Sequence, residues 1–194
     1  RFTQGMLRPG DVDFCYGSRD GQLWPILNTI FELDLAFETT DKAIEQRKNF
    51  LLQRRIGICD IVDRAEREHI DASDLGMKNI ELRDLLSLLS RYPKVKQLLF
   101  TGGNSKNGPE YLFRRHLKEK GLRLERVSDF IPRIHQFLMP GKGSAERLIT
   151  TVSLTAPSGS ANRAVGGLPE YKARKAADPE YTTLDFRVAQ YKRF

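Results

Sequence analysis

The sequence lacks long apolar runs. No stretch approaches the roughly 20 apolar residues that a membrane-spanning helix requires, and no signal-peptide pattern opens the chain. We therefore expect a soluble protein of the cytoplasm that does not associate with a membrane.

Cysteine and histidine are also scarce, with two and three residues respectively. Two thiols, Cys15 and Cys59, do not make a disulfide framework. They do not form a structural zinc site by themselves either, and no pair of histidines lies near them in the sequence. We expect no bound metal.

The chain has enough apolar residues for one core and an excess of positive charge. Its 194 residues are 40% hydrophobic, which suits one domain of ordinary size. Because neither a repeat nor a long linker divides the chain, we expect a single domain over residues 1–194. The net charge of +7 favours a polyanionic partner, chiefly nucleic acid, although many basic proteins bind no polyanion.

Hydrophobic periodicity predicts helices and strands that alternate along the chain. Expected helices cover residues 23–33, about 41–53, 81–91, 109–120, 161–176 and 184–193. Expected strands cover residues 56–62, 96–100, 133–139 and 147–154, with a weaker one at 122–127. This alternation is typical of a mainly parallel sheet with helices on both faces. Such sheets bind ligands at the carboxyl ends of their strands.

A polar loop with an aromatic residue at each end leads into the first helix, over residues 14–24. Tyr16 is placed to stack on a base, and Asp20 to position or activate a water molecule as a general base. In the alternative interpretation Asp20 caps the helix and Trp24 belongs to the core.

A second loop, residues 154–163, follows an apolar strand and is rich in small and hydroxyl side chains. Ser158, Ser160 and Asn162 offer donors to phosphate oxygens, and the small side chains permit close approach of the backbone. A helix N-cap at Ser160 is the simpler explanation for one of the two serines.

A third motif, Thr101–Lys106, follows the strand at 96–100. The amide of Asn104 both donates and accepts hydrogen bonds, as the reader of a base edge must, and Gly102 permits close approach. An ordinary strand-to-helix turn explains the same residues, and the spacing is not that of a phosphate-binding P-loop.

One further carboxylate, Asp60, lies within the apolar run 56–62. A carboxylate in a buried strand needs partners or a catalytic task. A salt bridge to Arg64 or Arg67 is the simpler interpretation.

In their order along the chain, these segments resemble the uracil-DNA glycosylase superfamily, most closely its branch of mismatch-specific and hypoxanthine (deoxyinosine) DNA glycosylases. The resemblance is carried by Tyr16-Gly17-Ser18-Arg19-Asp20-Gly21-Gln22-Leu23-Trp24, Gly57-Ile58-Cys59-Asp60-Ile61-Val62, Leu99-Phe100-Thr101-Gly102-Gly103-Asn104 and Ser153-Leu154-Thr155-Ala156-Pro157-Ser158-Gly159-Ser160-Ala161-Asn162. It extends over roughly residues 14–175.

The resemblance implies a three-layer α/β/α sandwich with a central, mainly parallel sheet. It implies a monofunctional DNA glycosylase of base excision repair, without metal or organic cofactor, that removes a flipped uracil, hypoxanthine or similar base. The expected catalytic residues are Asp20 and Asp60. Tyr16, Gly102 and Asn104 would form the base pocket, and Ser158, Ser160 and Asn162 would bind DNA phosphate. We expect the protein to act as a monomer on lesion-containing DNA.

The chain departs from the family pattern at three places. Gly21 stands where the branch carries an asparagine, and Ala156 where several branches carry a catalytic histidine. The opening strand of the family would lie upstream of residue 1. A catalytically silent DNA-binding relative and a nucleotide-binding protein therefore remain as alternatives.

Overall fold

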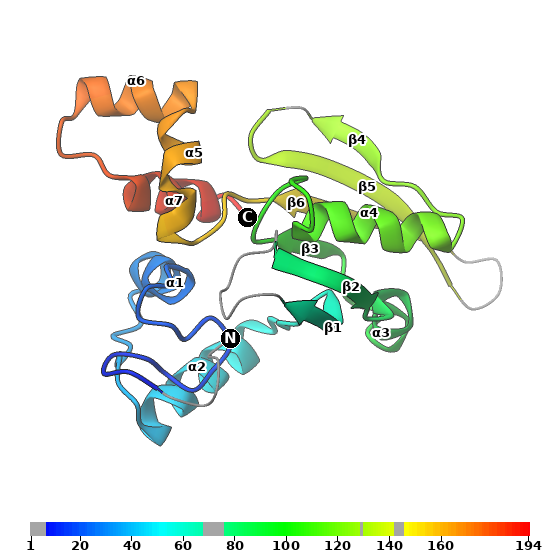
Figure 1. Cartoon of the computed structure of the whole chain (residues 1–194), viewed down its shortest axis with the longest axis horizontal. Helices are drawn as coiled ribbons and strands as arrows, with labels where there is room; N and C mark the ends of the chain where they lie inside the picture. The colour runs from blue at the N-terminus through cyan, green and yellow to red at the C-terminus, as the bar shows by residue number, and fades with distance from the viewer. Residues whose placement is uncertain (1–6, 68–75, 129, 142–145) are drawn as a thin grey trace. The chain divides into compact units, whose positions relative to one another are not determined.

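The computed structural model describes residues 7–67, 76–128, 130–141 and 146–194 (Figure 1). Backbone contacts divide the chain into two compact units. One unit comprises residues 1–59 and 157–194 and is here called the helical unit; the other, residues 60–156, is the sheet unit.

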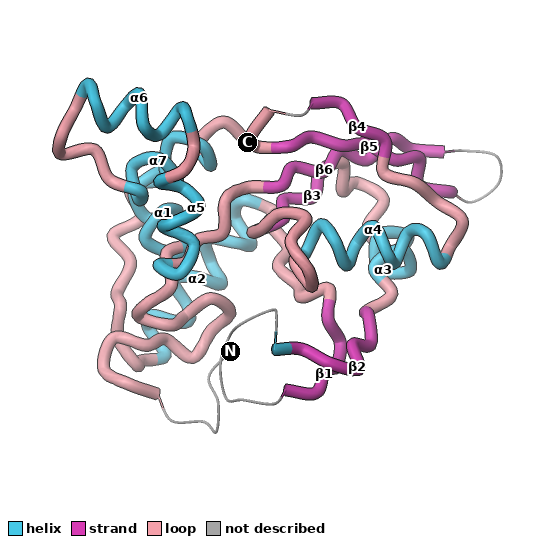
Figure 2. Tube along the Cα trace, turned by 45° about the horizontal axis from the view of Figure 1, so that its top comes forward, coloured by secondary structure: helices cyan, strands magenta, loops and turns pink. Residues whose placement is uncertain are grey.

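The helical unit is built from the two ends of the sequence, and two of its α-helices begin at side-chain caps. Its elements are α1 (Leu23–Phe31), α2 (Asp41–Arg54), the 3-10 helix η2 (Gly159–Ala161), α5 (Asn162–Gly166), α6 (Pro169–Ala177) and α7 (Thr183–Tyr191). The Thr40 hydroxyl caps α2 by accepting the backbone N–H of Ala43, and Thr182 with Asp185 forms a capping box on α7. Helix α1 packs against α7 (Figure 2).

An aromatic cluster forms the core of the helical unit. Trp24 of α1 and Phe50 of α2 are buried together with Leu35, and Phe31 packs against Phe50 with ring centroids 5.1 Å apart. This core joins α1 to α2 and leaves the loop before α1 to run over the surface.

The sheet unit contains two separate sheets and two helices. Its elements are β1 (Val62–Arg67), β2 (Met77–Leu82), α3 (Leu85–Arg91), β3 (Gln97–Phe100), α4 (Pro109–Glu119), β4 (Glu125–Ser128), β5 (Arg133–Pro140) and β6 (Glu146–Ser153). Strands β1 and β2 pair as a small antiparallel sheet. The larger sheet has the order β3-β6-β5-β4 (Figure 1). The fold is thus mixed α/β.

The larger sheet is mixed, whereas the sequence predicted a mainly parallel one. Only β3 and β6 run parallel; β5 runs antiparallel to both β6 and β4. The reason is local, because β4, β5 and β6 follow one another with no described helix between them, and consecutive strands so connected pair antiparallel.

Helices α3 and α4 pack on the same face of this sheet. Phe113 of α4 lies 5.2 Å from Phe100 of β3 and 5.5 Å from Phe137 of β5, measured between ring centroids. Leu138 and Leu148, which pair across β5 and β6 on the opposite face, are each 51% exposed. The described residues of the sheet unit thus form two layers, and the third layer of the expected sandwich stays a prediction.

Three other element predictions need correction. The run Ile56–Val62 is not a strand up to Ile61: Ile56 is exposed, and pairing starts at Val62. Residues 81 and 82 end β2, so the helix expected there begins only at Leu85. The helix expected at 161–176 is broken at Gly167-Leu168 before Pro169, which starts α6.

Within the described ranges, none of the helices combines the length and the apolar character that crossing a membrane would demand.

Candidate functional site

The loop that leads into α1 is folded by a compact turn over residues 12–17. The N–H of Val12 donates to the carbonyl of Gly17 at 2.7 Å, and the N–H of Gly17 donates to the carbonyl of Phe14 at 3.0 Å. A Cβ on Gly17 would lie 2.0 Å from the Val12 carbonyl oxygen, so only glycine fits. Tyr16 has a positive φ of 56° and remains 38% exposed. The turn therefore presents the aromatic side chain of Tyr16 on the surface.

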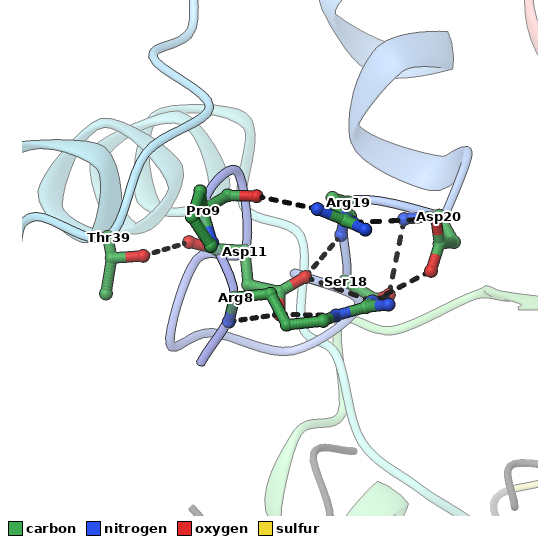
Figure 3. Close-up of polar contacts among 7 residues, drawn as sticks. All are labelled: Arg8, Pro9, Asp11, Ser18, Arg19, Asp20 and Thr39. Atoms are coloured by element: carbon green, nitrogen blue, oxygen red, sulfur yellow. Dashed lines mark hydrogen bonds and ion pairs between the residues drawn. The ribbon is translucent and has the colours of Figure 1, made fainter. Parts of the chain in front are cut away.

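A buried carboxylate, Asp11, fixes the rest of this loop (Figure 3). Its side chain is fully buried and accepts the backbone N–H groups of Arg8 and Arg19, each at 2.8 Å, together with the Arg8 guanidinium Nε at 3.3 Å. Burial alone would raise the pKa of Asp11, but the hydrogen bonds from Arg19 and Arg8 outweigh it and hold that pKa below its usual value. Asp11 is a structural anion of the loop.

The predicted catalytic residue Asp20 lies at the exposed side of the same network. Its side chain is 70% exposed, and its Oδ2 accepts from the Arg8 guanidinium at 2.8 Å. The backbone N–H of Asp20 donates to the Ser18 hydroxyl at 3.3 Å. Figure 3 shows Arg8 lying between Asp11 and Asp20. Asp20 is thus accessible to water and held by a guanidinium; it does not cap α1, whose N-cap is Gln22.

The structure brings the first and second sequence motifs side by side. Gly21 and Ser158 form an antiparallel β-bridge, and the N–H of Gln22 donates to the carbonyl of Pro157 at 2.9 Å. A Cβ on Gly21 would lie 3.0 Å from the Ser18 carbonyl oxygen and 3.3 Å from that of Tyr16. The carbonyls of its own loop therefore leave little room at position 21 for the asparagine of the family pattern.

The serines of the second motif form a small hydroxyl pair. The Ser158 side chain caps η2 by accepting the N–H of Ser160 at 3.2 Å, and the two hydroxyl oxygens lie 2.6 Å apart. The N-cap is therefore Ser158, whereas the simpler interpretation from sequence assigned it to Ser160. Ser160 is exposed and Ser158 half-buried, so both hydroxyls lie at the surface of the loop.

The third member of that motif, Asn162, is held by a buried arginine. Its Oδ1 accepts from Arg187 Nη1 at 2.8 Å and from the Thr183 hydroxyl at 3.0 Å. Arg187 is fully buried and also donates to the Ser158 carbonyl at 3.0 Å. Burial lowers the pKa of Arg187. Asn162 and Arg187 shape the loop, which leaves the two serines as its outward-facing donors.

The third sequence motif lies in the sheet unit, at the end of β3. Gly102 is buried, and a Cβ there would meet the Pro109 ring at 3.0 Å; a Cβ on Gly103 would lie 3.1 Å from the Arg133 guanidinium. Asn104 is exposed. The loop thus packs closely against Pro109 of α4 at Gly102, and Asn104 is available to a ligand.

Beneath this loop lies a charged cluster that the sequence did not predict, centred on the fully buried Glu110 of α4. Its Oε2 accepts from the Ser153 hydroxyl at 2.6 Å and from Arg133 Nη2 at 2.8 Å, and its Oε1 accepts from Arg114 Nε at 3.0 Å. Phe100, Ser153 and Arg133 are register partners across β3, β6 and β5. The cluster thus fastens α4 to the sheet row from which the loop departs.

Burial and charge act against each other in this cluster. Burial alone would raise the pKa of Glu110, but hydrogen bonds from Ser153 and Arg114 and the charge of Arg133 lower it below its usual value. Burial, and then the charge of Arg114, lower the pKa of His135, whose Nε2 lies 2.6 Å from Arg114 Nη2. At neutral pH the cluster therefore holds one carboxylate, two guanidiniums and a neutral imidazole.

The second predicted catalytic residue, Asp60, is not in a buried strand. It is exposed and precedes β1, and its backbone carbonyl accepts from Arg83 Nε at 3.1 Å. Of the two arginines expected as its partners, Arg64 pairs with Glu81 at 3.9 Å. An exposed carboxylate needs no partner, so the argument for a catalytic task at Asp60 no longer holds.

The structure therefore groups Tyr16, Asp20, Ser158, Ser160 and Asn162 in the helical unit, whereas Asp60, Gly102 and Asn104 belong to the sheet unit. Comparison with family models, with curated proteins and with solved structures found no match for this chain. Its function is therefore inferred from the residues themselves.

Proposed function

We propose that this chain is a monofunctional DNA glycosylase that hydrolyses the N-glycosidic bond of a flipped uracil, hypoxanthine or related base. The observation that carries the proposal is the bridge between Gly21 and Ser158. It joins two loops from opposite ends of the sequence, one with an aromatic residue and a carboxylate, the other with paired hydroxyls. Stacking, water activation and phosphate binding are the three tasks that excision of a flipped base requires.

In this proposal each side chain of the joined loops has one role. Tyr16, exposed at the turn, stacks on the flipped base. The Asp20 carboxylate accepts a proton from a water molecule as that water attacks the sugar C1′ atom. The C–N bond breaks, and the base departs with the bonding electron pair. The hydroxyls of Ser158 and Ser160 donate to a phosphate oxygen of the DNA backbone.

The distribution of charge supports a role for the second loop at the DNA backbone. Residues 1–59 are balanced, with 8 Lys and Arg against 8 Asp and Glu, whereas residues 157–194 carry 7 against 4. All but the buried Arg187 of these seven basic residues are exposed, namely Arg163, Lys172, Arg174, Lys175, Lys192 and Arg193. Exposed cations on the segment that follows a hydroxyl-rich loop favour binding to phosphates; two of them, Arg174 and Arg193, are paired with Glu170.

In the sheet unit we propose Asn104 as the reader of the base edge, with Gly102 allowing close approach. Membership of the uracil-DNA glycosylase superfamily, with its three-layer α/β/α sandwich, is part of the same proposal. It is supported by the parallel pair β3 and β6, at whose carboxyl ends the Asn104 loop begins. The antiparallel β4 and β5 are departures from that pattern.

The test is release of the base from oligonucleotides that carry uracil, hypoxanthine, xanthine or a G·T mismatch, with alkali cleavage to reveal abasic sites. We expect release from at least one lesion, and a loss of roughly 100-fold or more in Asp20→Asn. Asp13→Asn, an exposed carboxylate of the same loop, is the matched control and should retain the wild-type rate. Equal rates in wild type and Asp20→Asn would contradict the role of Asp20.

One observation favours a second candidate, a catalytically silent reader of damaged DNA. Position 21 has no side chain to orient water, and the carbonyls of Ser18 and Tyr16 restrict its replacement. This candidate predicts preferential, salt-sensitive binding to lesion DNA with no base release from any oligonucleotide in the panel. The two candidates therefore differ in one measured product, the abasic site.

A further inference from the structure

The loop between β4 and β5 exposes a small apolar patch. Phe130 is 86% exposed, Val127 56% and Ile131 46%, and no other large apolar side chain among the described residues is as exposed as Phe130. Single apolar residues are common on protein surfaces, whereas a contiguous exposed patch marks an interaction site. These three residues lie within five consecutive positions and are here called the apolar tip; their clustering calls for a partner.

The structure anchors the apolar tip on both sides. Strands β4 and β5 pair antiparallel as far as Ser128, and the N–H of Phe130 donates to the Ser128 hydroxyl at 3.3 Å. On the other side Pro132 is buried, and Arg133 donates to Glu110 at 2.8 Å. The tip is therefore held by the strands that flank it, and the Phe130 ring stays in the solvent.

The apolar tip belongs to a strongly basic part of the chain. Residues 94–133, which contain β3, α4 and β4, carry 10 Lys and Arg against 4 Asp and Glu. All ten basic residues are exposed except Arg114 and Arg133, which bind Glu110. Arg126 directly precedes the tip. An aromatic ring among exposed cations is the combination that binds single-stranded nucleic acid, because bases stack on the ring and phosphates are attracted to the cations.

We propose that the apolar tip binds single-stranded DNA, with Phe130 stacked on an unpaired base and Arg126 close to a neighbouring phosphate. In a duplex each base face is covered by the next base pair, so an aromatic side chain finds a free face only where the strand is unpaired. Val127 and Ile131 border the stacked base. A protein partner with an apolar surface would use the hydrophobicity of the tip but not the positive charge around it.

The experiment measures the affinity of the chain for a fluorescein-labelled oligothymidylate of about 15 nucleotides, a strand without a lesion, by fluorescence anisotropy. Phe130→Ala should weaken binding by at least about fivefold, because stacking on one base contributes this much or more. Phe130→Trp should keep the wild-type affinity, since the larger ring also stacks. Phe130→Leu, which stays apolar but cannot stack, should lose as much affinity as Phe130→Ala.

Two further variants separate stacking from charge. Tyr92→Ala removes an exposed aromatic ring of the sheet unit outside the tip and should leave the affinity unchanged. Arg126→Gln should weaken binding and lower the slope of log affinity against log salt concentration by about 0.7, the value for one phosphate contact on a single strand. Phe130→Ala should leave that slope at the wild-type value. Because Phe130 and Arg126 are exposed, these replacements leave the core intact, and circular dichroism checks the fold.

Three results would overturn the proposal: no measurable binding of the wild-type chain, unchanged affinity in Phe130→Ala, or equal affinity in Phe130→Leu and Phe130→Trp. The oligonucleotide carries no lesion, and no base release is measured. Failure of this test therefore leaves the proposed glycosylase activity standing, and failure of base release leaves the role of the apolar tip standing.

Discussion

Among the described residues, each of the two units buries one carboxylate completely, and the hydrogen-bond donors to the two carboxylates differ. Asp11 in the helical unit accepts two backbone N–H groups and one guanidinium. Glu110 in the sheet unit accepts from side chains, namely one hydroxyl and two guanidiniums. The pKa of both acids is lowered in spite of burial.

The difference indicates what each acid is for. Backbone donors fix the path of the chain, so Asp11 sets the conformation of the loop that carries Tyr16 and Asp20. Side-chain donors join separate elements, so Glu110 fastens α4 to β5 and β6 beneath the Asn104 loop. In each unit, a buried carboxylate thus stabilises the region from which a predicted site loop extends.

Removing the Glu110 side chain should give the largest loss in the free energy of unfolding. Glu110→Ala leaves two guanidiniums without their carboxylate, and we expect a loss of about 3 kcal/mol in the free energy of unfolding. Urea denaturation followed by circular dichroism measures it. Glu119→Ala, which removes an exposed acid paired with Arg115 on the same helix, should cost no more than about 0.5 kcal/mol. Equal losses in the two variants would show that the cluster does not fasten α4.

Removing the Asp11 side chain should lower the free energy of unfolding by less than removing that of Glu110. Asp11→Ala leaves two backbone N–H groups without an acceptor, a loss of about 2 kcal/mol by the same measurement. The loop, rather than a helix, loses its anchor, so proteolysis near residues 8–19 should also accelerate. Asp13→Ala is the matched exposed control, and its cutting rate should stay at the wild-type value. A loop in Asp11→Ala that resists protease as well as wild type would rule out the role of Asp11.

Removing a single hydrogen bond of the Glu110 cluster should lower the free energy of unfolding by a smaller amount. Ser153→Ala removes the hydroxyl donor at 2.6 Å but leaves both guanidiniums, so we expect about 1 kcal/mol. Ser90→Ala, whose exposed hydroxyl bonds only within α3, serves as the reference. A loss in Ser153→Ala as large as that in Glu110→Ala would mean that the hydroxyl, not the charge pair, holds the cluster together.

Lowering the pH should reduce the contributions of both Asp11 and Glu110 to the free energy of unfolding. A carboxyl with a lowered folded pKa adds stability that is complete above its unfolded value, about 3.9 for Asp and 4.3 for Glu. This stability is lost as the pH falls through the lower folded value. The stability gaps between wild type and Asp11→Ala, and between wild type and Glu110→Ala, should therefore narrow from about pH 6 to about pH 3. A gap that stays constant or widens on acidification would contradict the lowered pKa.

The sequence predicted most helices because their periodicity and caps are local. The helices that begin at Asp41, Pro109 and Thr183 all start within a residue of the expected position. The run Ile56–Val62 misled because apolar residues next to a glycine favour a strand only where they find a pairing partner. Strand direction was predicted wrongly because the general α/β pattern was applied to the strands at 122–127, 133–139 and 147–154, although consecutive strands with no helix between them favour antiparallel pairing.

In the candidate site, too, some features could be predicted from the sequence and others could not. Tyr16, Asp20 and Ser158 could be proposed from the sequence because their residue types suggest their chemistry. The bridge that joins their loops was not predicted, because backbone pairing leaves no residue signature. Arg187 and Glu110 were missed because a charged residue on an amphipathic helix is usually exposed, and only tertiary structure shows that these two are buried.

Binding of lesion-containing DNA tests the central claim most directly, because the glycosylase and the silent reader share it. The affinity of the chain is measured for a duplex with uracil or hypoxanthine and for the matched undamaged duplex, at several salt concentrations. We predict tighter binding to the lesion duplex and a steep loss of affinity as salt rises. Equal affinity for both duplexes, or binding that is insensitive to salt, would contradict a reader of damaged bases.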